Sequence, residues 1–256
     1  MAFDVAADAY NRFMGRFSEP LADRFAETAG LQSGQRALDV GCGPGALTAR
    51  LVELLGAEAV AAVDPSDSFV SAARTRCPGV DVRSAAAERL PFADDTFDAA
   101  LAQLVVHFMA DPVAGLREMA RVTRPGGVVA ACVWDHSGGG GPLAEFWQAV
   151  HELDPGERGE VDLPGARQGH LATLFESAGF EGVESLTLAV TVPFATYADW
   201  WQPFTLGVGP AGDYVDRLDE TRRDLLRERC ERRLPAAPFE LTASAWCARG
   251  RVTSVR

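Results

Sequence analysis

The chain has 256 residues, of which 47% are hydrophobic and 23% charged, so it is long and apolar enough to bury a full core. Its formal net charge of −12 argues against sequence-independent binding to nucleic acid phosphates. Every one of its 24 basic residues is arginine. Because lysine is absent, a Schiff-base mechanism, a P-loop lysine and a lysine general base are all excluded.

Cysteine usage predicts neither a disulfide scaffold nor a metal site and is typical of a reducing cytoplasm. The five cysteines are scattered and form no close pairs at metal-ligand spacing: Cys42, Cys77, Cys132, Cys230 and Cys247. The N-terminal residues lack the apolar run of a signal peptide, and no stretch approaches the roughly 20 apolar residues that span a bilayer. We therefore expect a cytoplasmic protein with no nucleic acid, membrane or metal partner.

The first 30 residues have a helical pattern. Residues 4–30 carry apolar side chains at spacings of three and four, which predicts a helix with one buried face. These side chains are Tyr10, Phe13, Phe17, Leu21 and Phe25. Pro20 interrupts the pattern, so we expect two short helices rather than one.

Strands and helices alternate over the next hundred residues. Short apolar runs predict buried strands at 36–41, 59–63, 80–83, 97–102 and 128–134. Helical patterns lie between them, at 46–55, 67–76 and 116–122. Ser66 or Asp67 is placed to cap the second of these helices, and residues 125–127 predict a turn into the fifth strand. This alternation indicates an α/β fold with a parallel sheet and helices on both faces.

The pattern changes after residue 134. A glycine run at 138–141 and a loop at 155–165 accompany helical segments at 143–153 and 171–178. Alternating segments at 183–192 and 239–248 predict two strands, with a helical insertion at 195–236 between them. We expect an antiparallel sheet edge that carries a cap. With no repeats and no second core, the prediction is one domain over 1–256, with residues 1–30 and 195–236 as its lid.

A glycine-rich turn, Ala37-Leu-Asp-Val-Gly-Cys-Gly-Pro-Gly-Ala-Leu-Thr48, is the most informative segment. Gly41, Gly43 and Gly45 lie where a strand turns into a helix, so the backbone can approach a ligand closely. Asp64 follows at the end of the next strand, placed to bind a ribose diol. The same glycines with Ala46 also fit the G-x-G-x-x-A pattern of nicotinamide enzymes. The turn alone therefore does not distinguish a nicotinamide enzyme from an enzyme that binds another ribose-containing cofactor.

Three further features distinguish between these two kinds of enzyme. Asp39 places a carboxylate where a pyrophosphate would be repelled but an ammonium group attracted. Glu88-Arg-Leu-Pro-Phe-Ala-Asp-Asp-Thr-Phe-Asp98 leads into the fourth strand, and Arg121-Val-Thr-Arg-Pro-Gly-Gly127 into the fifth. Over residues 37–134 the chain resembles the class I S-adenosylmethionine-dependent methyltransferases, in the subfamily similar to ubiquinone and menaquinone C-methyltransferases. The resemblance implies a Rossmann-like seven-stranded, mostly parallel sheet with an antiparallel last strand.

The resemblance also implies a cofactor site for S-adenosyl-L-methionine. Asp39 and the backbone of Gly41, Gly43 and Gly45 would contact the methionyl part, and Asp64 would bind the ribose hydroxyls. Pro65 would pack on the adenine face, and the N–H of Ala87 would bind the adenine edge. Gln103 would lie near the methionyl group, Tyr10 would cover that group, and Arg16 would pair with the methionyl carboxylate.

One position departs from the family pattern. The family often has an aspartate two residues before Glu88, where this chain has Ala86. Alanine cannot accept a hydrogen bond from the adenine amino group. Either Glu88 or water takes that role, or the affinity for the cofactor falls by about 1 kcal/mol.

Methyl transfer requires alignment and exclusion of water, and it requires a base only if the acceptor must lose a proton. His107, after the fourth strand, is the best base candidate, although a histidine at a helix start is also a common structural residue. His136 and His151 border the glycine run and could lie in the acceptor cavity, while His170 precedes a helix and fits a capping role.

Aromatic residues concentrate in the segments that would cover the strand ends: Trp134, Trp147, Trp200, Trp201 and Phe204. They form either an apolar acceptor pocket or the core of the lid itself. We therefore expect methyl transfer to a small apolar or aromatic acceptor. The alternative is a protein of this fold that binds the cofactor without transferring methyl, as a cyclase or a binding module. A nicotinamide dehydrogenase is the weaker third hypothesis.

Overall fold

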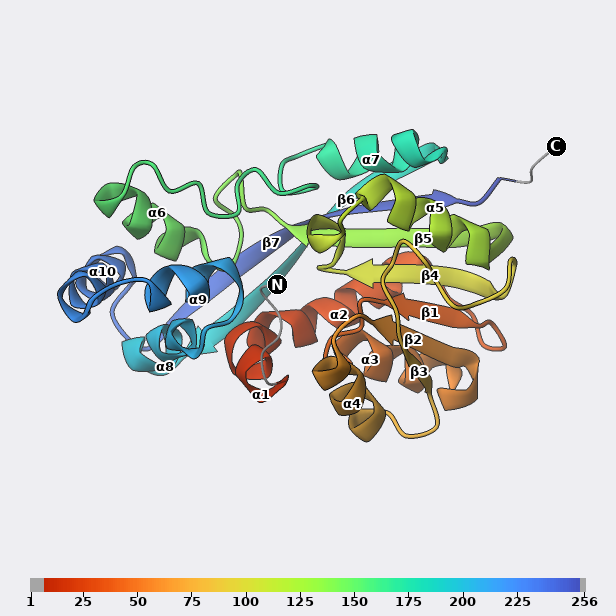
Figure 1. Cartoon of the computed structure of the whole chain (residues 1–256), viewed down its shortest axis with the longest axis horizontal. Helices are drawn as coiled ribbons and strands as arrows, with labels where there is room; N and C mark the ends of the chain where they lie inside the picture. The colour runs from red at the N-terminus through yellow and green to blue at the C-terminus, as the bar shows by residue number, and fades with distance from the viewer. Residues whose placement is uncertain (1–6, 254–256) are drawn as a thin grey trace.

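A single seven-stranded sheet runs through the molecule in the order β3-β2-β1-β4-β5-β7-β6 (Figure 1). The computed structural model describes residues 7–253. Its strands are β1 (Ala37–Val40), β2 (Val60–Asp64), β3 (Asp81–Ser84), β4 (Phe97–Gln103), β5 (Thr123–Trp134), β6 (Glu181–Phe194) and β7 (Phe239–Arg251). All neighbouring pairs are parallel except those of β7, which is antiparallel to β5 and to β6. The expected Rossmann-like sheet with an antiparallel last strand is confirmed.

Helices cover both faces of the sheet, as the alternation predicts (Figure 1). One face packs against α2 (Arg16–Ala29), α3 (Ala46–Leu55) and α4 (Asp67–Arg76). The other face packs against α5 (Pro112–Val122) and α7 (His170–Ala178). Strands β1 and β2 are short and largely apolar because both of their faces are buried, and in β1 all four residues are buried. Short 3-10 turns follow α3 at η2 (Ala57–Ala59) and β4 at η3 (Val106–Phe108).

The N-terminal helical segment continues through Pro20, so the expected break at that residue is wrong. The described segment comprises α1 (Ala7–Tyr10), a π-helical turn η1 (Asn11–Gly15) and α2, with Pro20 inside α2. Burial of the apolar face, including Leu21 and Phe25, offsets the single backbone hydrogen bond that the proline cannot donate. Residues 4–6 of the expected helix lie outside the described residues.

The expected turn at residues 125–127 is part of β5 instead. The pairing of β5 with β4 shifts between Phe97 opposite Thr123 and Ala99 opposite Val128, so β5 holds extra residues there. Gly126, at φ +80°, donates its N–H to the carbonyl of Val252 at 2.8 Å. The segment is therefore a bulge that pairs with the chain beyond β7 rather than a free turn.

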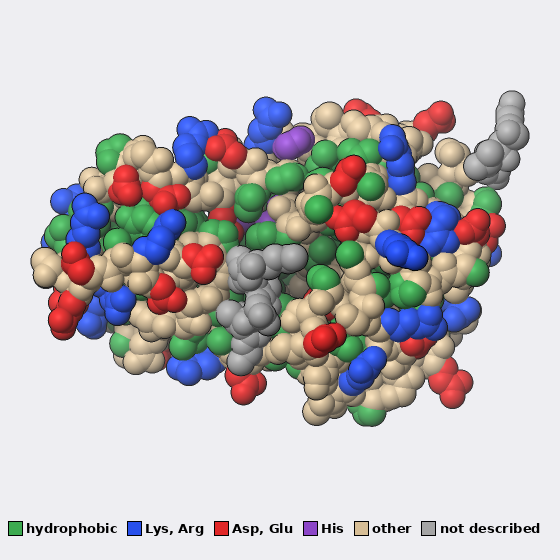
Figure 2. Space-filling model, viewed as in Figure 1, with side chains coloured by type: hydrophobic (Ala, Val, Ile, Leu, Met, Phe, Trp, Pro, Cys, Tyr) green, Lys and Arg blue, Asp and Glu red, His purple; other side chains and the backbone are tan. Residues whose placement is uncertain are grey.

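A helical cap covers the carboxyl ends of the strands, where β6 and β7 extend beyond the rest of the sheet (Figure 1). It consists of α6 (Ala144–Leu153), α8 (Tyr197–Trp201), η4 (Gln202–Leu206), α9 (Gly209–Asp216) and α10 (Glu220–Arg233). Arg233 of α10 forms ion pairs with Glu145 and Glu152 of α6 at 2.9 and 2.7 Å. Acidic and basic side chains alternate over the surface of the cap (Figure 2). None of the helices among residues 7–253 has the length and apolarity that crossing a bilayer requires.

Candidate functional site at the carboxyl ends of the strands

The glycine turn closes against the end of β2. The N–H groups of Gly41 and Cys42 both donate to the carbonyl of Val63, at 2.8 and 2.9 Å. Gly41 has φ +70°, and a Cβ atom built on it would lie 2.4 Å from Cγ2 of Val105. A side chain is therefore excluded at Gly41 both by the backbone conformation and by the close approach of Val105.

Asp39 is buried at the end of β1, next to this turn. The residue is 1% exposed, and its Oδ2 accepts a hydrogen bond from the Thr48 hydroxyl at 2.6 Å. Its Oδ1 is buried and has no hydrogen-bond partner among the described residues. Burial raises the pKa of Asp39 to about 7, and the nearby charge of Asp64 adds to the increase. A buried acceptor without a partner is costly, so this position fits a cationic ligand group such as an ammonium.

Asp64 ends β2 on the other side of the turn. Its Oδ2 accepts from the N–H of Gly43 and its Oδ1 from the N–H of Ser66, both at 2.9 Å. Because each carboxylate oxygen has two lone-pair sites, both oxygens can still accept a hydroxyl of a ligand. Burial raises the pKa of Asp64. Two carboxylates on adjacent strands thus flank one backbone turn, which has no room for a side chain at Gly41.

The residues expected to contact adenine surround the end of β2 and the turn before β4. Pro65 is exposed directly after Asp64, and Ala87 is buried. The N–H of Ala87 makes no hydrogen bond to any residue in the described range 7–253. Glu88 has a different partner, since its Oε1 accepts from the N–H of Asp111 at 3.2 Å. Ala86 is exposed, and Glu88 holds the start of α5.

The N-terminal segment approaches the site from the opposite side. The ring of Tyr10 lies edge-on to Phe69 with centroids 5.3 Å apart, and burial and then the charge of Asp64 raise the pKa of Tyr10. Gln103, at the end of β4, donates from Nε2 to the carbonyl of Ser18 at 2.9 Å, while its Oε1 is buried without a partner in the described chain. Arg16 is exposed, with its guanidinium 5.1 Å from the ring centre of Phe194 at the end of β6.

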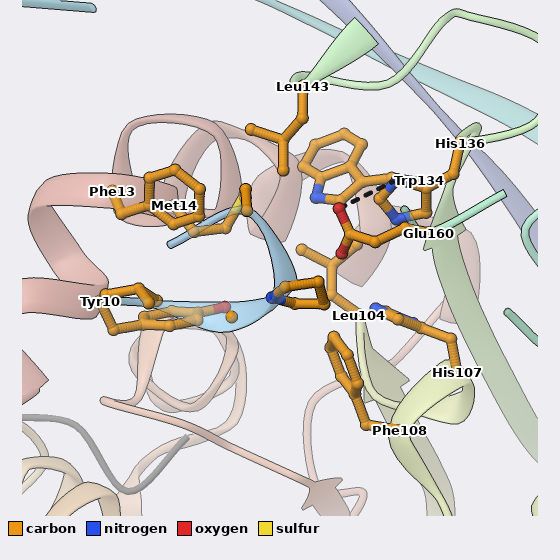
Figure 3. A pocket seen from close by; sticks show the side chains of 14 residues that line it. Tyr10, Phe13, Met14, Leu104, His107, Phe108, Trp134, His136, Leu143 and Glu160 are labelled. Carbon is orange, nitrogen blue, oxygen red and sulfur yellow. Dashed lines mark ion pairs between the residues drawn. The ribbon is translucent and has the colours of Figure 1, made fainter. Parts of the chain in front are cut away.

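A small cavity of about 30 Å³ lies between this N-terminal segment and the ends of β4 and β5 (Figure 3). Phe13 and Met14 of η1 form one wall, and Leu104, Trp134 and Leu143 extend the apolar lining. A further wall comes from residues 208–211 at the start of α9. The polar side chains His107, His136 and Glu160 meet on the side opposite η1 (Figure 3).

The two histidines of the cavity are buried in surroundings that favour the neutral imidazole. Burial lowers the pKa of His107 well below its ordinary value, and it also lowers the pKa of His136. Nδ1 of His107 and Nε2 of His136 have no hydrogen-bond partner within residues 7–253. The ring centroids are 5.8 Å apart. Of the other histidines, His151 lies on α6 away from the lining, and Nδ1 of His170 accepts from the N–H of Gly165 at the start of α7.

Glu160 is a site residue that the sequence pattern does not reveal. It is 4% exposed, although it lies in the segment expected to be a plain loop. Its Oε2 accepts from Nε1 of Trp147 at 2.9 Å and lies 3.8 Å from Nδ1 of His136. In the sequence it is one of several acidic residues in a segment rich in glycine and proline, a pattern that usually indicates a solvated loop.

The aromatic residues divide between the cavity and the cap core. Of the five expected at the strand ends, Trp134 lines the cavity. The ring of Phe204 stacks on Phe146 at 4.5 Å and contacts Trp200 at 4.7 Å, and Trp147 and Trp201 are buried in the same cluster. The four other expected side chains thus form the core of the cap in this structure.

Known proteins match this chain in both sequence and fold. Residues 38–131 match a family described as "Methyltransferase domain". A demethylmenaquinone methyltransferase of Mycobacterium sp. (strain KMS) is 46% identical over 105 residues, 40% of this chain and 43% of that protein. The chain thus spans less than half the length of the curated relatives it matches first.

Two solved structures illustrate the range of the fold. A geranyl diphosphate C-methyltransferase of Streptomyces coelicolor A3(2), in complex with S-adenosyl-L-homocysteine, superimposes with a TM-score of 0.56 at 13% identity, covering 93% of this chain and 80% of that one. The [4+2]-cyclase SpnF superimposes with a TM-score of 0.57 at 21% identity, covering 92% and 81%. The chain therefore has the fold of these solved structures, and its residues 38–131 match a methyltransferase domain and are similar in sequence to the demethylmenaquinone methyltransferases.

Proposed function

We propose that this protein transfers the methyl group of S-adenosylmethionine to a small apolar or aromatic acceptor. The observation that carries the proposal is the pair of buried carboxylates, Asp39 and Asp64, on either side of the turn at Gly41. A dinucleotide pyrophosphate would be repelled there, whereas an ammonium group would pair with the unpartnered Oδ1 of Asp39. The sequence match to methyltransferases over residues 38–131 supports the same cofactor.

Each end of the cofactor has its own protein groups in this proposal. S-adenosylmethionine supplies a methyl carbon that the positive sulfur activates. Asp39 binds the amino group and Asp64 the ribose hydroxyls. The N–H of Ala87, which bonds to none of the described residues, binds the adenine edge, and Pro65 packs on its face. Tyr10 and Gln103 cover the methionyl end and exclude water. Arg16 reaches the methionyl carboxylate only if its contact with Phe194 is exchanged for that ion pair.

The lining of the cavity favours an apolar acceptor. Among the described lining residues there is no arginine to pair with a phosphate or carboxylate, and the one full charge there is the acidic Glu160. His107 faces the acceptor from the end of β4, between Phe108 and His136. A relative named as acting on demethylmenaquinone supports an acceptor that contains an aromatic or quinoid ring.

Opening of the lid is part of the proposal. A cavity of about 30 Å³ holds one or two water molecules, far less than an aromatic ring needs. Its walls come from η1 and from residues 208–211, which belong to the segments 1–30 and 195–236. We expect these segments to move apart for the acceptor and to close over the cofactor. Hydrogen exchange in the described parts of both should slow on addition of S-adenosylhomocysteine, with little change at residues 128–134. Equal protection with and without ligand would show that they are rigid.

The cofactor assignment can be tested by calorimetry. S-adenosylmethionine and S-adenosylhomocysteine should each bind at one per chain. Asp64→Ala should weaken binding by about 1.5–3 kcal/mol for each hydroxyl that loses a charged acceptor, and Glu88→Ala, whose carboxylate holds Asp111, should weaken it much less. Equal affinities of the two variants would contradict the ribose assignment, and absence of binding to folded protein would overturn the proposal.

The alternative function is binding of the cofactor without methyl transfer. The superposition on the [4+2]-cyclase SpnF shows that this fold also occurs in a protein named as a cyclase. Incubation with methyl-labelled S-adenosylmethionine and a panel of phenols and quinols separates the two functions. Labelled product and S-adenosylhomocysteine are expected for the methyltransferase, whereas tight binding with no label transferred would favour the alternative.

A further inference from the structure

Among residues 7–253, a carboxylate lies within ion-pair distance of one of the two cavity histidines and not of the other. His136 follows β5, and its Nδ1 lies 3.8 Å from Oε2 of Glu160 (Figure 3). That oxygen is fixed because it accepts a hydrogen bond from Nε1 of Trp147 at 2.9 Å. Glu160 favours the tautomer of His136 that carries its proton on Nδ1. In that tautomer the buried Nε2, which has no partner among the described residues, is a proton acceptor at the cavity.

No carboxylate of the described residues forms an ion pair with His107. It is buried, and the titratable group that acts on its pKa is His136, which lowers it further. A proton taken up by His107 would create a buried cation that no described acidic group offsets. The charged groups that act on His136 are Glu160 and Asp135, and both favour its protonated form. Asp135 is itself fixed, since its Oδ1 accepts from the N–H of Gly138 at 2.7 Å and from Nε1 of Trp246 at 3.2 Å.

We propose that Nε2 of His136 is the general base that removes the proton from a hydroxyl group on the ring of a phenol-like acceptor, with Glu160 as its positioning residue. This inference rests on the proposed methyl-transfer function and assigns the base to His136 rather than to His107. The acceptor O–H bond breaks, the proton forms the N–H bond at Nε2, and both electrons of the broken bond stay on oxygen. The resulting phenolate donates an electron pair to the methyl carbon, and the pair of the breaking C–S bond remains on sulfur. The imidazolium then loses its proton to water when the cavity opens.

The same side chains define the class of acceptor. An aromatic ring fits among Met14, Leu104 and Trp134 once the lid has opened, and a single polar group fits at the histidine side. A phosphorylated or carboxylated acceptor would face the carboxylate of Glu160 without a cation to offset it. The acceptor is therefore a neutral aromatic compound whose ring hydroxyl becomes charged only after it reaches His136.

A binding experiment tests the proton transfer without any turnover. 4-Nitrophenol is the probe, because its phenolate has its own visible absorption, and S-adenosylhomocysteine is added to close the site. Below the solution pKa of the probe, the bound fraction should show the phenolate band, and the ¹⁵N resonance of His136 Nε2 should move to protonated values. His136→Gln should lose the phenolate band, whereas His151→Gln, outside the cavity on α6, should retain it. A probe that stays neutral when bound, or does not bind, would overturn the proposal.

Kinetics with a phenol that the protein methylates provide the second test. Removing a general base slows turnover by about 10²–10⁴-fold, so His136→Gln should lose kcat to that extent while keeping its affinity for S-adenosylhomocysteine. Glu160→Gln keeps an acceptor for Trp147 but removes the charge that raises the pKa of His136. The acid limb of its pH profile for kcat/KM should therefore move to lower pH, a shift that loss of packing alone would not produce.

Failure of this proposal is distinguishable from failure of the proposed function. A wild-type protein that does not bind S-adenosylmethionine refutes the function. A protein that binds and methylates, and whose His136→Gln variant keeps the wild-type rate while His107→Gln loses it, refutes only the assignment of the base. The titration of 4-nitrophenol on the wild-type protein needs no variant, so misfolding of a substituted chain cannot hide the answer.

Discussion

The two halves of the site are built in different ways. On the proposed cofactor side, Asp39, the turn at Gly41 and Thr48 lie within ten residues of one another, and the next strand contributes Asp64. On the proposed acceptor side, His107, His136 and Glu160 come from separate segments that meet only when the cap packs against the strand ends (Figure 3). Contacts that are local in the chain position the first group, whereas long-range packing positions the second.

The halves also differ in the buried polar atom that each leaves without a partner among the described residues. Oδ1 of Asp39 is a buried acceptor whose carboxyl has a raised pKa, so it is suited to receive a cationic group. Nε2 of His136 is a buried acceptor on a ring that its lowered pKa keeps neutral, so its lone pair is available to a hydroxyl group. The comparison indicates that binding of the cofactor and choice of the acceptor can be altered separately.

Truncation of the cap core should have the largest effect on stability. Trp200 is 3% exposed and packs against Phe204, so Trp200→Ala should lower the free energy of unfolding by about 3–5 kcal/mol. Urea denaturation measures this loss, and Trp200→Phe should recover much of it. Affinity for S-adenosylhomocysteine should change little, because the cofactor half is local. A Trp200→Ala variant with wild-type stability and weaker acceptor binding would instead place Trp200 in the acceptor pocket.

A side chain at Gly41 should destabilise the glycine turn of the proposed cofactor site. Gly41→Ala combines a left-handed backbone, which costs about 1–2 kcal/mol, with a clash against Val105 that costs about 1–3 kcal/mol. Gly30→Ala is the matched control, because Gly30 has φ +61° and an added Cβ there meets no atom within 4 Å. Equal unfolding free energies for the two variants would show that the contact with Val105 has no energetic consequence. The double variant Gly41→Ala with Val105→Ala should recover part of the loss.

Asp39→Asn should separate stability from cofactor binding. The folded pKa of Asp39 is raised from 3.8 to about 7, so between these values the folded state binds more protons than the unfolded state. The contribution of Asp39 to stability therefore falls as the pH rises from about 4 to about 7, by at most about 4 kcal/mol at 1.36 kcal/mol per unit. An asparagine at this position does not titrate, so the substitution removes this dependence.

The variant should thus be more stable than the wild type at pH 8, by about 1–3 kcal/mol, and the difference should vanish towards pH 4. Urea denaturation at both pH values measures it, and calorimetry should show weaker binding of S-adenosylhomocysteine. An Asp39→Asn variant that is less stable than the wild type at pH 8 would mean that the carboxylate is already compensated in the absence of ligand.

The smallest expected effect, on cofactor affinity, concerns Ala86, which stands where the resembled family often has an aspartate. Because Glu88 is engaged by the N–H of Asp111, Ala86→Asp should supply the missing acceptor and tighten cofactor binding by about 1 kcal/mol. Ala93→Asp adds the same charge at another exposed position and should not tighten it. Unchanged affinity of Ala86→Asp would indicate that Glu88 or water already serves the adenine amino group.

Local patterns were sufficient for most elements of the fold. The helices at Ala46–Leu55 and Asp67–Arg76 lie where the periodicity predicts them, and Ser66 caps the second by accepting from the N–H of Phe69. The expectations at Pro20 and at residues 125–127 were wrong for one common reason. In each case tertiary contacts outweighed the local preference of the chain. Burial of α2 outweighed the break expected at Pro20, and the hydrogen bond from Gly126 to Val252 outweighed the turn expected at residues 125–127.

The sequence by itself determined the sheet, the glycine turn and the two carboxylates beside it, because their geometry follows from hydrophobic runs and from a backbone conformation that only glycine adopts readily. Only the tertiary structure decided which histidine faces a carboxylate. Glu160 lies in a loop without a periodic pattern, and its burial beside His136 depends on a hydrogen bond from Trp147 and on the packing of the cap. Such a pair is created by contacts between distant segments, which no local pattern of residues encodes.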